Sequence, residues 1–431
     1  MSAYLWYGLM RPDIFAWVEN KYPVSLLFGV TSVLSSLAGG VADLHRCLIS
    51  NPLVRMLFLL QIPISLSVLF AVDRDLSVPR YLFYIRVIMV LIFLPLAIRT
   101  EQFMRLAFLT IALSLGFLGV KFGLYGIVAG GADLTRSGFG EMFADNNFLA
   151  LGLATNLAIC WYGRAVTSSP ILKVILLGMF GCSISGIVMF NSRGGVIAAT
   201  ICLLILVFRS KSKTIALVVV LGMMAGSIYL VENMFFHRMG TLTQEDPDAS
   251  AESRLEHAKV AVRMWKDHPI LGVGFGGLNY GNLVPLYSNI GNLTQHVAHN
   301  SYLQVLVDSG FAAFLLYVGE LGYAIVWLGN TGKRLKKEKA PESAVAVTYG
   351  LQTSLITFAI GSTFYSANRI DLLYILLMMT AAWYAILKQQ AETETAVPVQ
   401  AQAPAIRFTP AIRQVPRSIT PGSASFGPRE N

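Results

Sequence analysis

The sequence is poor in charged residues and in cysteine. Only 13% of its 431 residues are charged, while 55% are hydrophobic, and average soluble domains contain about 25% charged residues. This composition excludes an ordinary soluble globular protein. The four cysteines, Cys47, Cys160, Cys182 and Cys202, lie in or beside apolar runs, so the sequence predicts no disulfide framework. We expect a protein that crosses a membrane several times.

Long apolar runs are what the sequence has in abundance. Eleven of them are long enough, or nearly so, to cross a bilayer, which takes about 20 helical residues. They lie at residues 23–42, 53–72, 81–99, 106–129, 147–163, 171–190, 194–208, 214–231, 300–329, 344–365 and 371–387. Residues 1–20 hold a shorter apolar segment that ends at Arg11. The sequence therefore predicts an all-α, polytopic membrane protein with about 11–12 transmembrane helices.

Lysine and arginine concentrate in every second connecting loop, for example at residues 209–213 and 333–339. Such loops stay on the cytoplasmic side of a membrane, which places the long polar stretch 232–299 on the opposite side. We therefore divide the chain into N-terminal transmembrane helices (1–231), an outside loop (232–299), C-terminal transmembrane helices (300–388) and a tail (389–431). The tail is rich in Ala, Pro, Gln and Thr, so we expect it to be disordered and cytoplasmic.

The net charge of +9 is explained by these inside loops and the tail. Basic residues there orient the protein and attract anionic lipid headgroups. We therefore expect membrane lipids as partners and no nucleic acid.

The outside loop contains a predicted amphipathic helix at residues 250–267. One face of it carries Leu255, Ala258, Ala261, Val262 and Trp265. Arg254 projects with this face, where a charged group needs an anionic partner. The membrane interface or a local carboxylate satisfies this requirement as well as a bound ligand does. Both interpretations of Arg254 stay open at this point.

Three neighbouring features have structural interpretations. Ser253 and Glu256 stand at capping-box spacing, and Arg263 is expected to pair with Asp267 one helical turn away. The glycine-rich segment 272–277 resembles a nucleotide-binding loop, but no strand precedes it. We expect it to provide backbone flexibility at the membrane surface.

Arginines on the outside are candidates for binding phosphate. Arg193 follows Ser192 and precedes two glycines in an outside turn, where a ligand can approach the backbone closely. Guanidinium groups match phosphate oxygens bidentately. Arg136 and Arg369 are weaker candidates of the same kind.

His299 stands at the start of an apolar run and is a candidate proton acceptor, because a neutral imidazole can take a proton near neutral pH. A structural role stays open as well. His296 lies three residues earlier, so a metal pair with His237 or His257 has to be considered. The outer triplet Asp73-Arg74-Asp75 is either a divalent-ion site or an ordinary acidic loop. The sequence has no HExxH pattern, and we expect no metal site.

Taken together, these motifs resemble the O-antigen ligase and polysaccharide polymerase superfamily of bacterial inner membranes. The resemblance rests on Ser192-Arg193-Gly194, Arg254-Leu255, His268 to Phe275, and His299-Asn300 followed by Gly310. The N-terminal half, through segments 9–17, 115–121 and 145–147, is most similar to an exosortase-associated branch of O-glycosylation ligases.

The resemblance implies a glycosyltransferase that uses an undecaprenyl diphosphate-linked glycan as donor. The acceptor would be lipid A-core, another glycan or a protein, at the periplasmic face of the inner membrane. His299 would be the base, with Arg193 and Arg254 on the diphosphate and Asn300 and His296 as weaker candidates. Such a reaction would invert the anomeric carbon and need neither a metal nor a cofactor.

Two alternatives stay open. A polymerase that adds repeat units shares the same motifs, and Ala313 stands where the ligase pattern has Gly, Thr or Tyr. A transporter or flippase of about twelve spans would place ionisable residues near the middle of the membrane. The polar candidates cluster at one face instead, which favours the enzyme.

Overall fold

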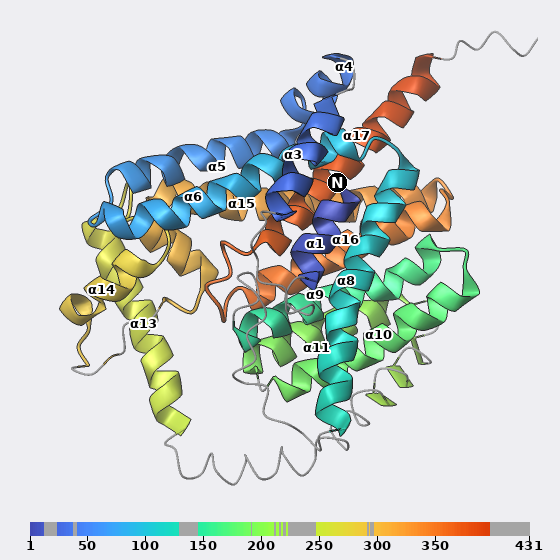
Figure 1. Cartoon of the computed structure of the whole chain (residues 1–431). Coiled ribbons are helices and arrows are strands. Elements are labelled where there is room, and N and C mark those ends of the chain that lie inside the picture. Colours follow the sequence, from blue (N-terminus) through green and yellow to red (C-terminus); the bar gives the residue numbers. More distant parts are fainter. Residues whose placement is uncertain are drawn as a thin grey trace, which may run out of the picture. The chain divides into compact units, whose positions relative to one another are not determined.

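A computed structural model describes residues 1–12, 24–37, 41–128, 145–190, 192–210, 213–214, 217–218, 221–222, 247–290, 293 and 297–396. All regular elements within these ranges are helical (Figure 1). Residues 1–388 form one compact unit and residues 389–431 a second. The all-α architecture predicted from the apolar runs is confirmed.

The helices follow the apolar runs closely. They are α1 (Ser2–Met10), α3 (Val24–Leu37), α4 (Val41–Leu44), a π-helix (His45–Ile49), α5 (Pro52–Leu69), α6 (Arg74–Leu91), α7 (Leu94–Ala97), α8 (Glu101–Val128), α9 (Asn146–Val166), α10 (Pro170–Met189), α11 (Arg193–Arg209), α13 (Pro247–Asp267), α14 (Leu278–Tyr287), α15 (Ser301–Lys337), α16 (Glu342–Gly361) and α17 (Asp371–Ala396).

Eight of the described helices are long and apolar enough to cross a membrane, and each matches one of the predicted runs. Two further runs correspond to α3 and α11, which have 14 and 17 residues. The predicted run 214–231 lies almost wholly outside the described residues. The segment that was a possible twelfth span is α1, a helix of nine residues that packs on α8.

The start of the predicted tail differs from expectation. Helix α17 continues through Ala396, so the first residues after Gln389 are helical, and the prediction of disorder is wrong for them. The sequence of residues 389–396 favours a helix, because it includes Gln, Ala and Glu, which are good helix formers. Residues 397–431 lie outside the described part of the chain.

Side-chain caps fix the residues at which α15 and α11 begin. The Asn300 carboxamide accepts hydrogen bonds from the Tyr302 and Leu303 amides at 2.9 and 3.1 Å, which starts α15. Ser192 Oγ accepts from the Gly195 amide at 3.3 Å and starts α11. These bonds satisfy amide groups that have no partner within the helix. Two motifs of the sequence thus act first as helix caps.

Helix α15 is interrupted at Gly310, where φ is 78° and ψ is −178°. The break frees the carbonyls of Val307 and Asp308, which accept hydrogen bonds from the Val273 and Gly274 amides at 2.9 and 3.0 Å. The segment 272–277 crosses the break so closely that a Cβ at Gly272 would collide with the backbone of α15. Its four glycines also have positive φ, a conformation that favours glycine. The expectation of a flexible glycine segment is wrong, because its backbone is fixed against α15.

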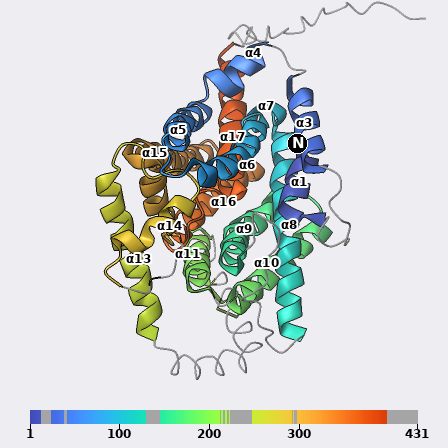
Figure 2. The same ribbon diagram turned by 60° about the vertical axis from the view of Figure 1, so that its left-hand side comes forward.

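Helices α13 and α14, drawn in yellow, lie beside α15 in both views (Figure 1, Figure 2). A separate apolar cluster joins the three elements, and it consists of Val260, Ala261, Met264, Val273, Tyr280, Val284, Ala298 and Val307. The outside loop of the sequence therefore contains a packed helical cap on the first turns of α15.

The buried face of α13 overlaps the predicted one only at Ala261. Glu256 and His257 are buried, whereas Leu255 is 56% exposed. Glu256 accepts hydrogen bonds from Arg263 at 2.8 Å and from the Asn289 amide at 3.1 Å, so its carboxylate is partnered. The predicted Arg263–Asp267 pair is replaced by this contact. Hydrophobic periodicity missed the face because polar residues with distant partners occupy it.

The start of α13 also differs from the prediction. The helix begins at Pro247, six residues before Ser253, so Ser253 lies inside it and does not form the predicted capping box with Glu256. Glu256 is engaged by the end of α14 instead. The bond from Arg263, together with that from the Asn289 amide, lowers the pKa of Glu256 from its ordinary value of 4.5.

We predict that Gly310→Ala destabilises the protein strongly, whereas Gly322→Ala on the same helix does not. A Cβ at position 310 collides with the Ile270 carbonyl and forces an L side chain to positive φ, which alone costs about 1–2 kcal/mol. A Cβ at position 322 meets nothing within 4 Å, and alanine favours a helix by about 1 kcal/mol over glycine. Thermal unfolding in detergent compares the two variants, and equal stabilities would contradict the prediction.

Glu256→Gln is expected to destabilise α13 and α14 at neutral pH by about 1.5–3 kcal/mol, since it weakens a hydrogen bond to a charged group. The folded-state pKa of Glu256 is depressed, so its stabilisation is complete above pH 4.5 and is lost as the pH falls through the folded value below that. The melting temperatures of wild type and variant should therefore converge in acid. Glu338→Gln, which removes an exposed carboxylate at 4.0 Å from Arg334, is the control.

Candidate functional site

The connector between α16 and α17 holds the first turn of α15. The Ser301 amide donates to the Ser362 carbonyl at 2.8 Å, and Ser301 Oγ bridges the Tyr365 carbonyl at 2.7 Å and the Ala367 amide at 2.8 Å. The Asn300 carboxamide, besides capping α15, donates to the Thr363 carbonyl at 3.2 Å. The position of His299 therefore depends on a connector more than sixty residues further along the chain.

The same connector reaches the start of α11. The hydroxyl of Tyr365, a residue that is 3% exposed, is hydrogen-bonded to Ser192 Oγ. Gly194 permits this approach, because a Cβ there would collide with the Tyr365 hydroxyl and with Phe364. Arg193 stands between the capping serine and this glycine and is exposed. The Ser-Arg-Gly turn thus presents its arginine beside a buried tyrosine.

Arg254 approaches the same tyrosine from α13. Burial raises the pKa of Tyr365, while its hydrogen bond with Ser192 and the positive charge of Arg254 act in the opposite direction. Arg254 is exposed, as Arg193 is. The two arginines that the sequence singled out for phosphate binding are therefore both near Tyr365, although about 60 positions separate them. The prediction that Arg254 lies on the buried face of α13 is wrong, because its side chain is exposed and needs no anionic partner to compensate for burial.

His299 lies next to α13, against His257, which is one helical turn from Arg254 on that helix. Its ring centroid is 5.9 Å from that of the buried His257, with an interplanar angle of 76°. His299 has a φ of 52°, which is uncommon for a residue with a side chain and costs of order 1–3 kcal/mol. The backbone is therefore held in a strained conformation where the candidate base is found.

His257 has a fixed orientation behind His299. The Tyr280 hydroxyl donates its proton to the His257 carbonyl at 2.8 Å and lies 3.2 Å from His257 Nδ1. Because the phenol has only one proton, Nδ1–H has to donate to the phenol oxygen. His257 is thereby oriented as a support for His299. His237 and His296, the other members of the metal pairs considered above, lie outside the described residues.

The remaining candidates do not join this group. Arg369 is near Asp308 and Arg80, and burial lowers its pKa while the Asp308 charge opposes that effect. Asp73 caps α6 by accepting from the Asp75 amide at 2.9 Å, and its backbone is bound to Asn279. The DxD triplet therefore has a structural role at the contact between α6 and α14. Arg136 lies outside the described residues.

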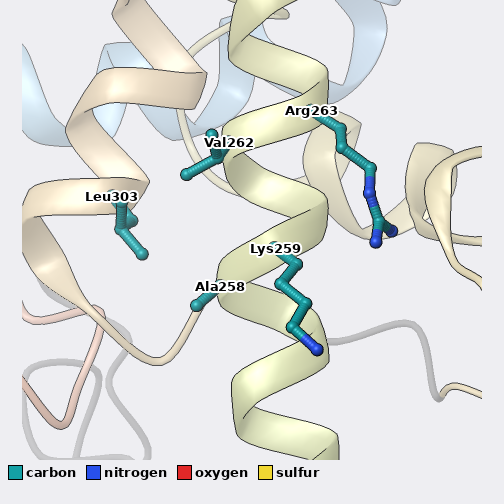
Figure 3. A pocket seen from close by; sticks show the side chains of 5 residues that line it. All are labelled: Ala258, Lys259, Val262, Arg263 and Leu303. Carbon is teal, nitrogen blue, oxygen red and sulfur yellow. The ribbon is translucent and has the colours of Figure 1, made fainter.

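An open groove of about 380 Å³ lies beside the site, between α13 and the start of α15. Figure 3 shows Ala258 and Val262 on the side of α13 that faces Leu303, while Lys259 and Arg263 leave the helix on the other side. Ala258 directly follows His257. The wall of the groove between α13 and the start of α15 is therefore apolar.

These groups together can bind an anion and accept a proton. Arg193 is the first residue of a 17-residue helix, whose N-terminus also favours negative charge, and Arg254 acts on Tyr365, the partner of the serine that caps this helix. His299, whose backbone is strained, contacts His257, one helical turn from Arg254 on α13. Among the residues that the structure describes, no group of three His, Cys, Asp or Glu side chains could hold a metal ion.

Sequence reasoning missed the residues that join these groups. Tyr365, Gln304 and Asp308 were not singled out, and each is buried. Asp308 did carry a signal, since a carboxylate inside an apolar run is rare and is functional by default. Tyr365 carried none, because a tyrosine near a helix end is ordinary in a membrane protein.

Comparison with known families matches residues 178–318 to the family described as O-antigen ligase and residues 1–151 to a family of unknown function (DUF5935). No curated protein matches the chain. The first match includes Arg193, Arg254 and His299. The similarity to the exosortase-associated branch stays a prediction, because the N-terminal family has no assigned function.

Tyr365 and the connector that carries it lie beyond the matched segment. The matched segment itself contains the start of α11, both helices of the cap and the break in α15. Residues 178–318, about a third of the chain, therefore match the O-antigen ligase family.

Proposed function

We propose that the protein transfers a glycan from undecaprenyl diphosphate to an acceptor hydroxyl at the periplasmic face of the bacterial inner membrane. The observation that carries this proposal is the convergence of Arg193, Arg254 and His299. Helices α11 and α13 supply the arginines, the residue before the cap of α15 supplies the histidine, and Tyr365, Ser192 and His257 connect them. A diphosphate needs fixed positive charge, and an acceptor hydroxyl needs a base, so the group matches both substrates.

The reaction follows from these positions. The acceptor oxygen forms a bond to the anomeric carbon as His299 takes the hydroxyl proton. The bond from that carbon to the diphosphate oxygen breaks, and its electron pair leaves with undecaprenyl diphosphate. Arg193 and Arg254 stabilise the negative charge that develops there, a contribution worth about 3 kcal/mol for each such donor. Attack opposite the leaving group inverts the anomeric configuration.

The contacts between helix ends support the proposed sidedness. Ser192 with Tyr365 and Ser301 with Ser362 join the ends of α11, α15 and α16 that the loop charges assign to the outside. Arg105 Nη2 donates to Ser343 Oγ at 2.7 Å. This bond joins the ends of α8 and α16 that the loop charges assign to the inside. These contacts support the proposal that the candidate site is on the face opposite the basic loops.

The proposed reaction needs only a hydroxyl group from its acceptor. Lipid A-core, a glycan chain and a protein all offer hydroxyl groups, and a polymerase would use the end of a growing polysaccharide. Mass spectrometry of the glycoconjugates lost from a deletion strain identifies the acceptor, and restoration by the plasmid-borne protein shows that the loss is specific.

We predict that His299→Ala, Arg193→Ala and Arg254→Ala each lower transfer by about 100- to 1000-fold, since each removes one group that acts in the transition state. The arginine variants should also bind undecaprenyl diphosphate more weakly, whereas His299→Ala should bind it as wild type does. Lys266→Ala removes an exposed charge from the same helix as Arg254 and should transfer normally. Normal transfer by His299→Ala would remove the proposed base.

Chelation with EDTA is expected to leave transfer unchanged, because arginines supply the positive charge on the diphosphate. The measurement is the rate of transfer in purified protein before and after EDTA, with Mg²⁺ restored as control. Loss of activity that Mg²⁺ reverses would contradict the metal-independent mechanism.

A further inference from the structure

A buried hydrogen-bonded pair in the first turns of α15 connects the backbone before His299 to the glycine segment. Gln304 is 1% exposed and Asp308 is 0% exposed. Gln304 Nε2 donates to Asp308 Oδ1 at 2.8 Å, and Asp308 Oδ2 accepts from the Gly276 amide at 3.1 Å. Neither residue is among those assigned to binding or chemistry above.

The orientation of the Gln304 amide is determined by its partners. Its oxygen accepts from the Ala298 amide at 2.8 Å and from Ser366 Oγ at 3.0 Å. The nitrogen must then face Asp308, which has only acceptors when ionised. Arg369 supplies a positive charge near that carboxylate. Each side-chain oxygen and nitrogen of the pair therefore has a hydrogen-bond partner, and position 304 needs an amide while position 308 needs a carboxylate.

Both ends of the pair lead to the candidate site. Ala298 precedes His299, whose backbone is strained, and Ser366 follows Tyr365, which contacts Ser192. Asn300 holds the other side of His299 through the connector. A residue with positive φ keeps that conformation only where its surroundings impose it. The bond from Ala298 to Gln304 is one such restraint here.

We propose that Gln304 and Asp308 are positioning residues that fix the backbone of His299 relative to the α16–α17 connector. The pair touches neither substrate and acts through His299 and Tyr365. This inference rests on the proposed function for its effect on catalysis, while its structural part concerns the placement of His299 alone.

The test exchanges the amide and the carboxylate. Asp308→Asn alone sets two donors against each other, because an amide cannot accept from both Gln304 and Gly276. Gln304→Glu alone sets two carboxylates against each other. The double variant combines both changes, so that the carboxylate is at position 304 and the amide at position 308. The carboxylate then accepts hydrogen bonds from the Ala298 amide, from Ser366 Oγ and from the side-chain nitrogen at position 308. The side-chain oxygen at position 308 accepts from the Gly276 amide. All hydrogen bonds and the net charge are thereby restored.

We expect each single variant to lower kcat by about 100-fold, the effect of a 1 Å misplacement, with donor binding unchanged. The double variant should recover most of the wild-type kcat. In a His299→Ala background the single variants should cause no further loss, since they act through that residue. Additive losses there would show a general structural role and overturn the proposal.

A second readout is independent of transfer. Modification of His299 by diethyl pyrocarbonate, followed by peptide mass spectrometry on the folded protein in detergent, should change rate in both single variants and return to the wild-type rate in the double variant. Glu320→Gln makes the same carboxylate-to-amide change at a buried position further along α15 and should leave the rate unchanged.

The two proposals fail in different ways. Normal transfer by His299→Ala overturns the proposed function, whatever the modification rates are. Unchanged modification of His299 in both single variants overturns the positioning role, whatever their activity is.

Discussion

The break in α15 is the constraint on which the outer part of the structure depends. A helix interrupted at Gly310 leaves carbonyls that need hydrogen-bond partners, and in a membrane protein irregular backbone persists only where protein or water satisfies it. The segment from Gly272 to Gly277 provides the partners here, and it is continuous with α13 on one side and α14 on the other. The helical cap is therefore anchored at the same place where the transmembrane helix opens.

This arrangement explains why catalytic candidates from distant parts of the chain meet. The glycine segment fixes the cap, and the cap brings Arg254 and His257 to the start of α15. The connector after α16 adds Tyr365, which contacts Ser192 and so includes the N-terminus of α11. Backbone contacts between helix ends, more than direct contacts between the charged side chains, create the site.

The sequence predicted the membrane helices well, because an apolar run of the right length has few other solutions. Arg193, Arg254 and His299 were identified through motifs and through their position on the outside. The orientation of α13 was not predictable in this way, because polar residues on its buried face find their partners in α14 or just after it. Glu256 accepts from the Asn289 amide, and Arg263, the other partner of Glu256, donates to the Tyr287 carbonyl. His257 is bound by Tyr280. Tyr365 and Gln304 likewise gain their roles only from tertiary contacts.

The connector between α16 and α17 has a consequence for biogenesis. It belongs to the last pair of transmembrane helices, and it binds both the serine that starts α15 and the tyrosine partner of α11. During synthesis, the arginines and the histidine emerge well before this pair is inserted. The ribosome therefore has to complete the hairpin of α16 and α17 before the earlier residues acquire their shared geometry, and a nascent chain without this hairpin holds the proposed site unassembled.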